Sequence, residues 1–100
     1  MTLQINTVYT FKLNSGEELL AKVTGISNYP MVELSEPVSI APSPQGMGLV
    51  PSMFTSEPTE TVVININSVS LYAPTEEKVR FKYVEATTGI QLPEKKIILG

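Results

Sequence analysis

The chain has 100 residues, of which 42% are hydrophobic and 17% are charged, and its formal net charge at pH 7 is −3. These values are typical of one globular domain, because two smaller domains would each be too short to bury a core. The chain contains no Cys, no His and no Asp, which excludes disulfides, thiol and imidazole chemistry, and calcium loops rich in aspartate. We therefore expect a non-enzymatic protein with no catalytic residue, no metal and no cofactor.

The chain also gives no indication of a membrane location or of secretion. No segment approaches the ~20 consecutive apolar residues that a membrane helix needs. The first ten residues contain no basic residue and no apolar block of the signal-peptide type. A cytoplasmic location is the expectation, in the host cytoplasm or within a virion if the protein is phage-encoded.

The first predicted elements form a hairpin. Residues 8–13 alternate apolar and polar side chains, which favours a strand, and the sequence NSG that follows predicts a turn in which Gly16 takes a positive φ. Residues 19–26 resume as a second strand, where the small Ala21 leaves room on one face and Gly25 tolerates a bend or bulge. One face of this strand carries Leu19, Ala21 and Val23.

The middle of the chain predicts a third strand and an insertion. Residues 31–40 read as a strand that Pro37 interrupts, so its far half is an edge or a bulged segment. The residues APSPQG at 41–46 predict a loop by composition, residues 47–54 a weak strand, and residues 56–60 a further loop.

Residues 62–66 are the most β-prone of the chain, and a turn at Asn67-Ser68 leads into a last strand over residues 69–72. Five or six short strands with no helical crossover predict a mainly β fold, namely a small, strongly bent antiparallel barrel.

The residues after this last strand fit two structures. Pro74-Thr75 as a helix entry, acidic residues in the first turn and Gly89 as a stop predict a helix over residues 75–88. Residues 79–83 also alternate as a strand would. The capping signals and the length favour the helix, and residues 89–100 are expected to form an exposed or partner-seeking tail.

The segment FKLNSGEELLAKV at residues 11–23 resembles the first motif of the Sm/Lsm family, with Gly16 at the family's turn position and Ala21 where the family usually has Gly. The resemblance implies one domain over residues 1–100, with a five- to six-stranded barrel at about 8–72. It extends to the small Sm-like proteins of large tailed phages, through this hairpin, the GMGLVP segment and the terminal helix.

The resemblance also implies an RNA site. Tyr29 falls on the family's aromatic position, which stacks on an RNA base, and Met31 falls beside it. The second family motif aligns with ININSVSLY, where Asn65 and Ile66 replace its Arg-Gly, so the cation of the RNA pocket is missing. Tyr29 could equally be a turn aromatic packed against Pro30, and Asn65 an outward polar residue of an alternating strand.

The carboxylates offer little chemistry. Glu17 and Glu18 are adjacent on a strand and point to opposite faces, so they cannot easily share a proton or a metal ion. We interpret them as solvated charges of the hairpin. Serine nucleophiles would lack an imidazole to activate them, so neither an enzyme nor a small-molecule substrate is expected.

The resemblance implies that the last two strands pair between copies, giving a homo-oligomer, either a ring or a smaller assembly. The residues expected at this oligomer edge are Val62, Val63, Ile64, Ile66, Val69 and Leu71. Single-stranded RNA is the first ligand to consider. The alternative is a structural or interaction protein of phage assembly, or a host adaptor, which keeps the fold and has lost RNA binding.

Overall fold

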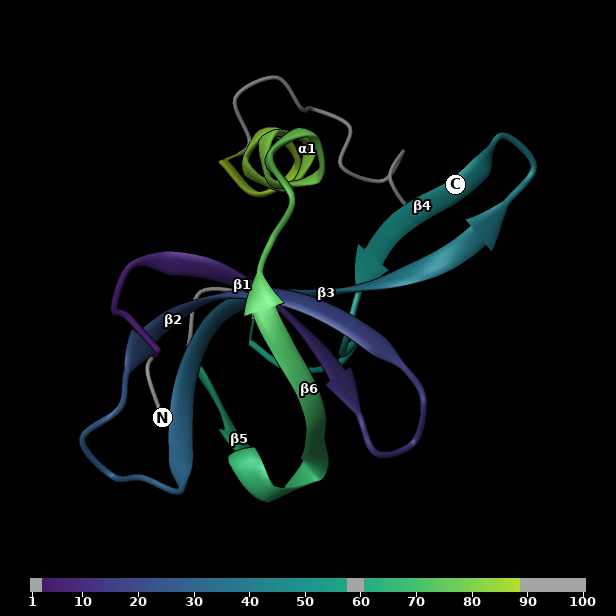
Figure 1. Cartoon of the computed structure of the whole chain (residues 1–100). Coiled ribbons are helices and arrows are strands. Elements are labelled where there is room, and N and C mark those ends of the chain that lie inside the picture. Colours follow the sequence, from purple (N-terminus) through teal and green to yellow (C-terminus); the bar gives the residue numbers. More distant parts are fainter. Residues whose placement is uncertain (1–2, 58–60, 89–100) are drawn as a thin grey trace.

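The computed structural model describes residues 3–57 and 61–88 (Figure 1). Within these residues the elements, in chain order, are β1 (Thr7–Leu13), β2 (Glu18–Gly25), β3 (Met31–Ser43), β4 (Gly46–Pro51), β5 (Val62–Asn65), the 3₁₀ helix η1 (Ile66–Ser68), β6 (Val69–Pro74) and α1 (Glu77–Thr88). The prediction of a mainly β fold with a C-terminal helix is confirmed. The predicted tail, and part of the predicted loop at 56–60, lie outside the described residues.

The strands form one antiparallel sheet in the order β4-β3-β2-β1-β6, with β5 also paired to β3. β3 serves two partners, because its residues 31–34 pair with β5 and its residues 38–43 pair with β4. The predicted closed barrel is not found in the described part of the chain. There, β5 and β6 are joined through η1 but do not pair with each other, and the buried side chain of Ile66 fills this corner, so the sheet is bent and open.

The β1–β2 turn has the conformation that the sequence predicts. Gly16 has a φ of +98°, and its N–H donates to the carbonyl of Leu13 at 2.8 Å. The N–H of Leu13 in turn donates to the carbonyl of Glu17 at 2.8 Å. These bonds close a three-residue loop, in which a residue with positive φ at the third position is the favoured geometry.

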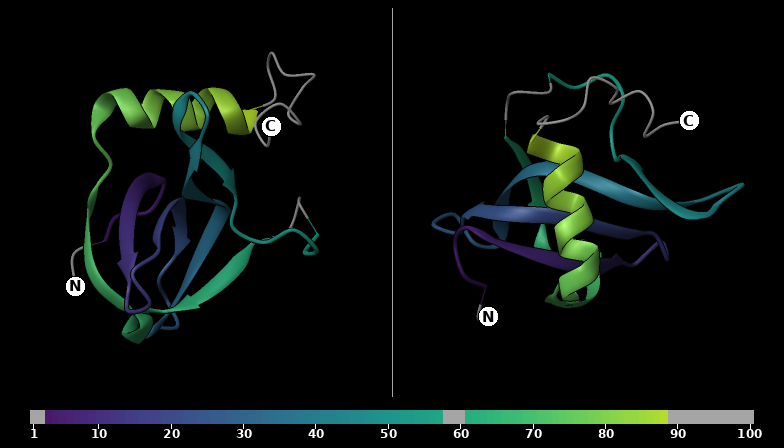
Figure 2. Two further views of the ribbon diagram at one scale, coloured as in Figure 1. Left: turned by 90° about the vertical axis from the view of Figure 1, so that its right-hand side faces the viewer. Right: turned by 90° about the horizontal axis from the view of Figure 1, so that it is seen from above.

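Two β-bulges bend the sheet around the predicted positions. Leu20 is opposite Val38 while Lys22 is opposite Ser35, so β3 carries one extra residue facing Ala21. Glu36, inside this bulge and just before Pro37, has a φ of +52°. A second register shift between Val23 and Gly25 adds a residue to β2. Since a bulge bends its strand and increases the local twist, the two together curl the sheet (Figure 2).

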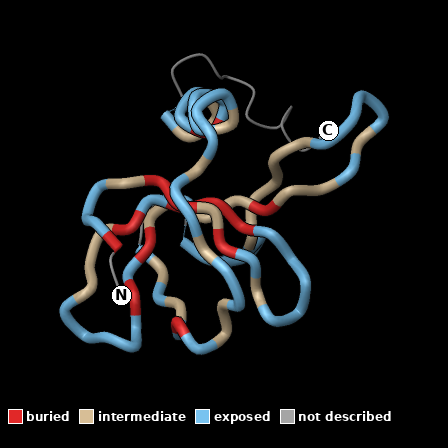
Figure 3. Tube along the Cα trace, viewed as in Figure 1, coloured by how far each residue is buried: buried red, intermediate tan, exposed pale blue. Residues whose placement is uncertain are grey.

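The bent sheet separates two apolar clusters, and buried segments follow its strands in Figure 3. The inner cluster lies on the concave side and contains Leu3, Tyr9, Phe11, Leu19, Ala21, Val23, Val32, Leu34 and Ile66. This confirms the shared face predicted for the second strand. The outer cluster contains Val8, Leu20 and Tyr83, so α1 covers the opposite face of β1 and β2.

Hydrogen bonds connect the α1 helix to the bulge of β3. The Tyr83 hydroxyl donates to the carbonyls of Ser35 and Glu36, at 3.0 and 2.9 Å. Val79, one turn earlier, packs against the same outer cluster. Of the two structures that the sequence allowed for residues 79–83, the helix is the one observed, and it places Val79 and Tyr83, four residues apart, on the face that meets the sheet.

The prediction of a loop at residues 41–46 is wrong for its first half. Residues 41–43 belong to β3, and a two-residue turn at Pro44-Gln45 leads directly into β4. Gly46, with a φ of +113°, allows this tight connection. The result is an arm made by the far half of β3 and by β4, which projects from the sheet (Figure 1).

Candidate functional site

The structure brings together the three residues predicted to bind RNA. The turn that carries Tyr29 lies against the start of η1, where the N–H of Ile66 donates to the carbonyl of Pro30 at 2.8 Å. Met31, the first residue of β3, is the cross-strand partner of Asn65, the last residue of β5. Met31 and Asn65, 34 positions apart in the sequence, therefore share one end of the β3–β5 pair.

Tyr29 is the aromatic residue of this group, and more than half of its surface is exposed. It precedes Pro30 through a cis peptide bond, and its side chain is 56% exposed. The turn is held by a hydrogen bond of 2.8 Å from the N–H of Met31 to the carbonyl of Asn28. An aromatic ring on an ordered turn, with more than half of its surface exposed, can offer a face for stacking.

Asn65 has a structural contact that the sequence interpretation missed. Its Oδ1 accepts the N–H of Asn67 at 2.9 Å and so caps η1, while its carbonyl accepts from the Ser68 hydroxyl at 2.8 Å. The pattern Asn-Ile-Asn-Ser is the available signal, because a short amide or hydroxyl side chain before a turn often bonds the backbone two residues on.

A second asparagine ties the β1–β2 turn to the same corner. Asn14 donates from Nδ2 to the carbonyl of Asn67 at 2.9 Å and accepts at Oδ1 from the Ser70 hydroxyl at 2.7 Å. The backbone N–H of Asn14 donates to the carbonyl of Ser68 at 2.7 Å. The corner between β5 and β6 is thus built from uncharged amide and hydroxyl groups.

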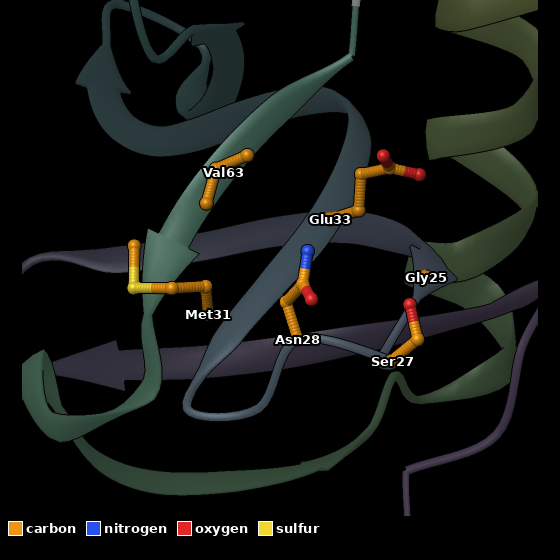
Figure 4. A pocket seen from close by; sticks show the side chains of 6 residues that line it. All are labelled: Gly25, Ser27, Asn28, Met31, Glu33 and Val63. Carbon is orange, nitrogen blue, oxygen red and sulfur yellow. The ribbon is translucent and has the colours of Figure 1, made fainter.

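A shallow pocket of about 100 Å³ lies between the β2–β3 turn and β5 (Figure 4). It is lined by Gly25, Ser27, Asn28, Met31, Glu33 and Val63. Its volume is well below the roughly 300–1,000 Å³ of typical small-molecule sites. Glu33 is the one ionisable group of the lining, so the pocket repels phosphate.

Gly25 has a steric role in this pocket. A Cβ at this position would lie 2.9 Å from Oε1 and 3.1 Å from Cβ of Glu33, which is closer than ordinary contact. The Glu33 carboxylate accepts a hydrogen bond from the Thr24 hydroxyl at 3.2 Å. The predicted bulge position therefore also leaves room for the charged group beside it.

The predicted oligomer edge divides into two kinds of residue. Val62, Ile64, Ile66 and Val69 pack into or against the inner cluster. Val63 on β5 and Leu71 on β6 point outward instead, with 58% and 67% of their surfaces exposed. Among the described residues, β5 pairs only with β3 and β6 only with β1, so each of these two strands has a free side, as does β4 at the far end of the sheet, which also pairs only with β3.

The interpretation of Glu17 as a solvated charge is incomplete. Its carboxylate accepts a hydrogen bond from the hydroxyl of the buried Ser39, whose Oγ also lies 2.9 Å from that of Ser52. Glu17 and Glu18 are both exposed, but Glu17 also ties the β1–β2 turn to β3. In residues 3–57 and 61–88 no three carboxylates gather in a group that could hold a metal ion.

Comparison of the sequence with protein-family models and with curated proteins gives no match. Within the described part of the chain, α1 falls short of the length and hydrophobicity that a membrane-crossing helix requires. The candidate sites are the corner at Tyr29 and Asn65 and the free sides of β5 and β6, the two strands that flank η1.

Proposed function

We propose that this chain is a non-enzymatic Sm-like module that self-associates by pairing β5 of one copy with β6 of the next. The observation that carries the proposal is the pair of free strand sides, one on each side of η1. Unpaired backbone N–H and C=O groups on a terminal strand are a template for pairing with another chain. The similarity of residues 8–72 to the Sm/Lsm motifs supports the same assembly.

Two different edges make the contact heterologous. Each copy offers β5 to one neighbour and β6 to another, so the contact repeats from copy to copy. Such a contact closes into a ring where the rotation between neighbours allows it. A ring or a smaller assembly of this kind would place one Tyr29 per copy on a common surface.

Lysine substitutions at the two free edges test the assembly. We expect Val63→Lys and Leu71→Lys each to reduce the molar mass measured by light scattering, and the double variant to be a monomer, because charges on edge strands oppose pairing. Both side chains are largely exposed, so the fold itself should be retained. Phe81→Lys is the matched control, since Phe81 is 62% exposed on α1. A wild-type monomer at all concentrations would refute the proposal.

A second candidate function is binding of single-stranded RNA at Tyr29. It is favoured by the exposure of the ring and by its position next to Met31 and Asn65. The net charge of −3 and the Glu33 carboxylate oppose it, because phosphate binding relies on Lys and Arg. The alternative is the same assembly without RNA, acting as a structural part of a phage or as a host adaptor.

Fluorescence anisotropy with short U-rich and A-rich RNA separates these alternatives. If Tyr29 stacks on a base, we expect micromolar or tighter binding that Tyr29→Ala weakens by ~1–3 kcal/mol. Tyr72→Ala would disturb the core, so Phe81→Ala is the better control for the loss of an exposed aromatic ring. Absence of binding at low salt would leave the structural role as the function.

A further inference from the structure

The arm made by the far half of β3 and by β4 has a third free strand side, at the opposite end of the sheet from β6. Within residues 3–57 and 61–88, β4 pairs with β3 alone. The chain carries no charged residue from Pro37 to Ser56. Proteins usually protect a terminal strand with charged side chains or cover it with another segment. Because β4 lacks charges, we expect this edge to be covered.

The register of the arm shows which backbone groups of β4 face the free side. Ser43 and Gly46 flank the two-residue turn and form a hydrogen-bonded pair, and such pairs alternate along an antiparallel ladder. The N–H of Ser52 donates to a carbonyl of β3 at 3.1 Å, in keeping with this alternation. Met47 and Leu49 lie at the intervening positions, so their N–H and C=O groups point away from β3.

The side chains of the same two residues lie on the face of the arm that α1 covers. Leu49 packs against the outer cluster together with Ile40, its cross-strand partner on β3. Met47, two residues earlier, shares this face and is 67% exposed. Gly48 lies between them and leaves the opposite face without a side chain at that position. A strand added beside β4 would therefore meet apolar groups on one face and open space on the other.

We propose that residues 95–99 of the same chain cover this edge as an added antiparallel strand. The segment contains Ile97, Ile98 and Leu99, aliphatic residues of which the two isoleucines are strongly β-prone. Ile97 is opposite Leu49 and Leu99 is opposite Met47, so both pairs share the face that α1 covers. The contact is independent of the pairing of β5 with β6, because it uses a different edge.

The end of α1 is close enough for this contact. Tyr83 on α1 enters the same outer cluster that Leu49 packs against, and its hydroxyl bonds to the β3 bulge at the base of the arm. Figure 2 shows the C-terminal half of α1 beside this base. Lys95 follows Thr88, the last residue of α1, by seven positions, and an extended chain of that length spans up to about 25 Å.

The direction of the added strand follows from the same arrangement. β4 runs from the turn of the arm back to its base, so a segment that enters from α1 and runs outward is antiparallel to it (Figure 1). Glu36 and Lys22 lie beside the base with opposite charges, so charge gives the segment little net preference. The contact therefore depends on backbone hydrogen bonds and on apolar side chains.

Hydrogen exchange of single amides tests the contact, because β4 contains its own control. We expect a chain shortened after Leu92 to exchange the Met47 and Leu49 amides about tenfold faster than the full chain, as for a contact favoured tenfold over release. The amides of Gly48 and Val50 face β3 and should change little. Unchanged rates at Met47 and Leu49 would overturn the proposal. Equal acceleration of all four amides would also overturn it, because the truncation would then act on the whole arm.

Cysteine pairs identify the chain that supplies the strand, because the protein has no Cys of its own. Gly48 and Ile98 would form a non-hydrogen-bonded pair with Cα atoms about 4.5 Å apart, within the range of disulfides. A Cβ at Gly48 meets its nearest neighbour, Oγ of Ser43, at 3.8 Å, so the side chain fits.

Mild oxidation in dilute solution should close an intrachain disulfide in the variant with Gly48→Cys and Ile98→Cys, seen as loss of free thiol without a change in molar mass. Gly48→Cys with Ile97→Cys is the matched control, because neighbouring residues of a strand point to opposite faces. A disulfide between chains would assign the strand to a second copy. Equal thiol loss in both variants would show that no such register exists. Either result would overturn the proposal and would leave the pairing of β5 with β6 to its own test.

Discussion

Replacing Tyr83 by alanine is expected to lower the free energy of unfolding by about 3–5 kcal/mol, as for other buried aromatic residues. Tyr83 is 2% exposed and is the side chain of α1 that enters the outer cluster with Val8 and Leu20. Its loss would leave a cavity between helix and sheet and would release α1 from the bulge of β3. Urea unfolding followed by far-ultraviolet circular dichroism measures the effect.

Tyr83→Phe isolates the hydroxyl from the ring. This variant keeps the packing but removes the donor to the carbonyls of Ser35 and Glu36. A typical intramolecular hydrogen bond contributes about 0.5–1.5 kcal/mol, so the phenylalanine variant should lie between the wild type and the alanine variant. Equal stability of the wild type and the phenylalanine variant would show that the hydroxyl does not fasten the helix.

The hydroxyl also gives the protein a distinctive alkaline behaviour. Burial, and secondly the charge of Glu36, raise the pKa of Tyr83 above its usual value. In the unfolded chain the phenol ionises near pH ~10, whereas in the folded protein it remains neutral. The unfolded state therefore binds fewer protons above this pH, and the free energy of unfolding falls as pH rises. The fall should be steeper in the wild type than in Tyr83→Phe, which lacks the group.

The parts of the fold that the sequence predicts well depend on local chemistry. The β1–β2 turn requires only that Gly16 take a positive φ, and the helix requires only its capping signals and length. The bulges near Ala21 and Gly25 are indicated by small residues in an otherwise regular strand. These features can be inferred from a few neighbouring residues.

The parts that the sequence predicts poorly depend on distant partners or on rare backbone positions. Pro42 lies in a segment that was predicted to be a loop, but it belongs to β3 and pairs with Met47 of β4. Proline is tolerated there because this hairpin lies at the edge of the sheet. The hydrogen bond between Asn14 and Asn67 joins residues 53 positions apart, so no local sequence pattern predicts it. Closure of the barrel was expected from the family motif, but η1 and Ile66 occupy the corner where the last strands would meet.

The candidate site was predictable in part. The motif placed Tyr29, Met31 and Asn65 in one site, and the chain does bring their backbones together. Whether RNA binds there stays a prediction. The alternation of apolar and polar residues does not predict that Asn65 caps η1 or that Glu33 lines a pocket. Both contacts depend on the position that the neighbouring turn takes in the folded chain.

Replacing Ala21 by leucine is the second substitution with a large expected effect. Ala21 is fully buried on the concave face of β2, with Tyr9 as its cross-strand partner and the bulge of β3 on its other side. A larger side chain would meet the inner cluster where the sheet is most curved. Overpacking of this kind costs about 1–3 kcal/mol, and occasionally more.

Ala73→Leu is the matched control, because Ala73 is exposed on β6 and the same added atoms would meet solvent. Its stability should stay within ~0.5 kcal/mol of the wild type. Urea unfolding of both variants at one protein concentration, with light scattering to report assembly, separates loss of the fold from loss of pairing. An Ala21→Leu protein as stable as Ala73→Leu would mean that the bend tolerates a bulky residue. In that case the curvature that holds β5 and β6 apart as free edges must come from the two bulges alone.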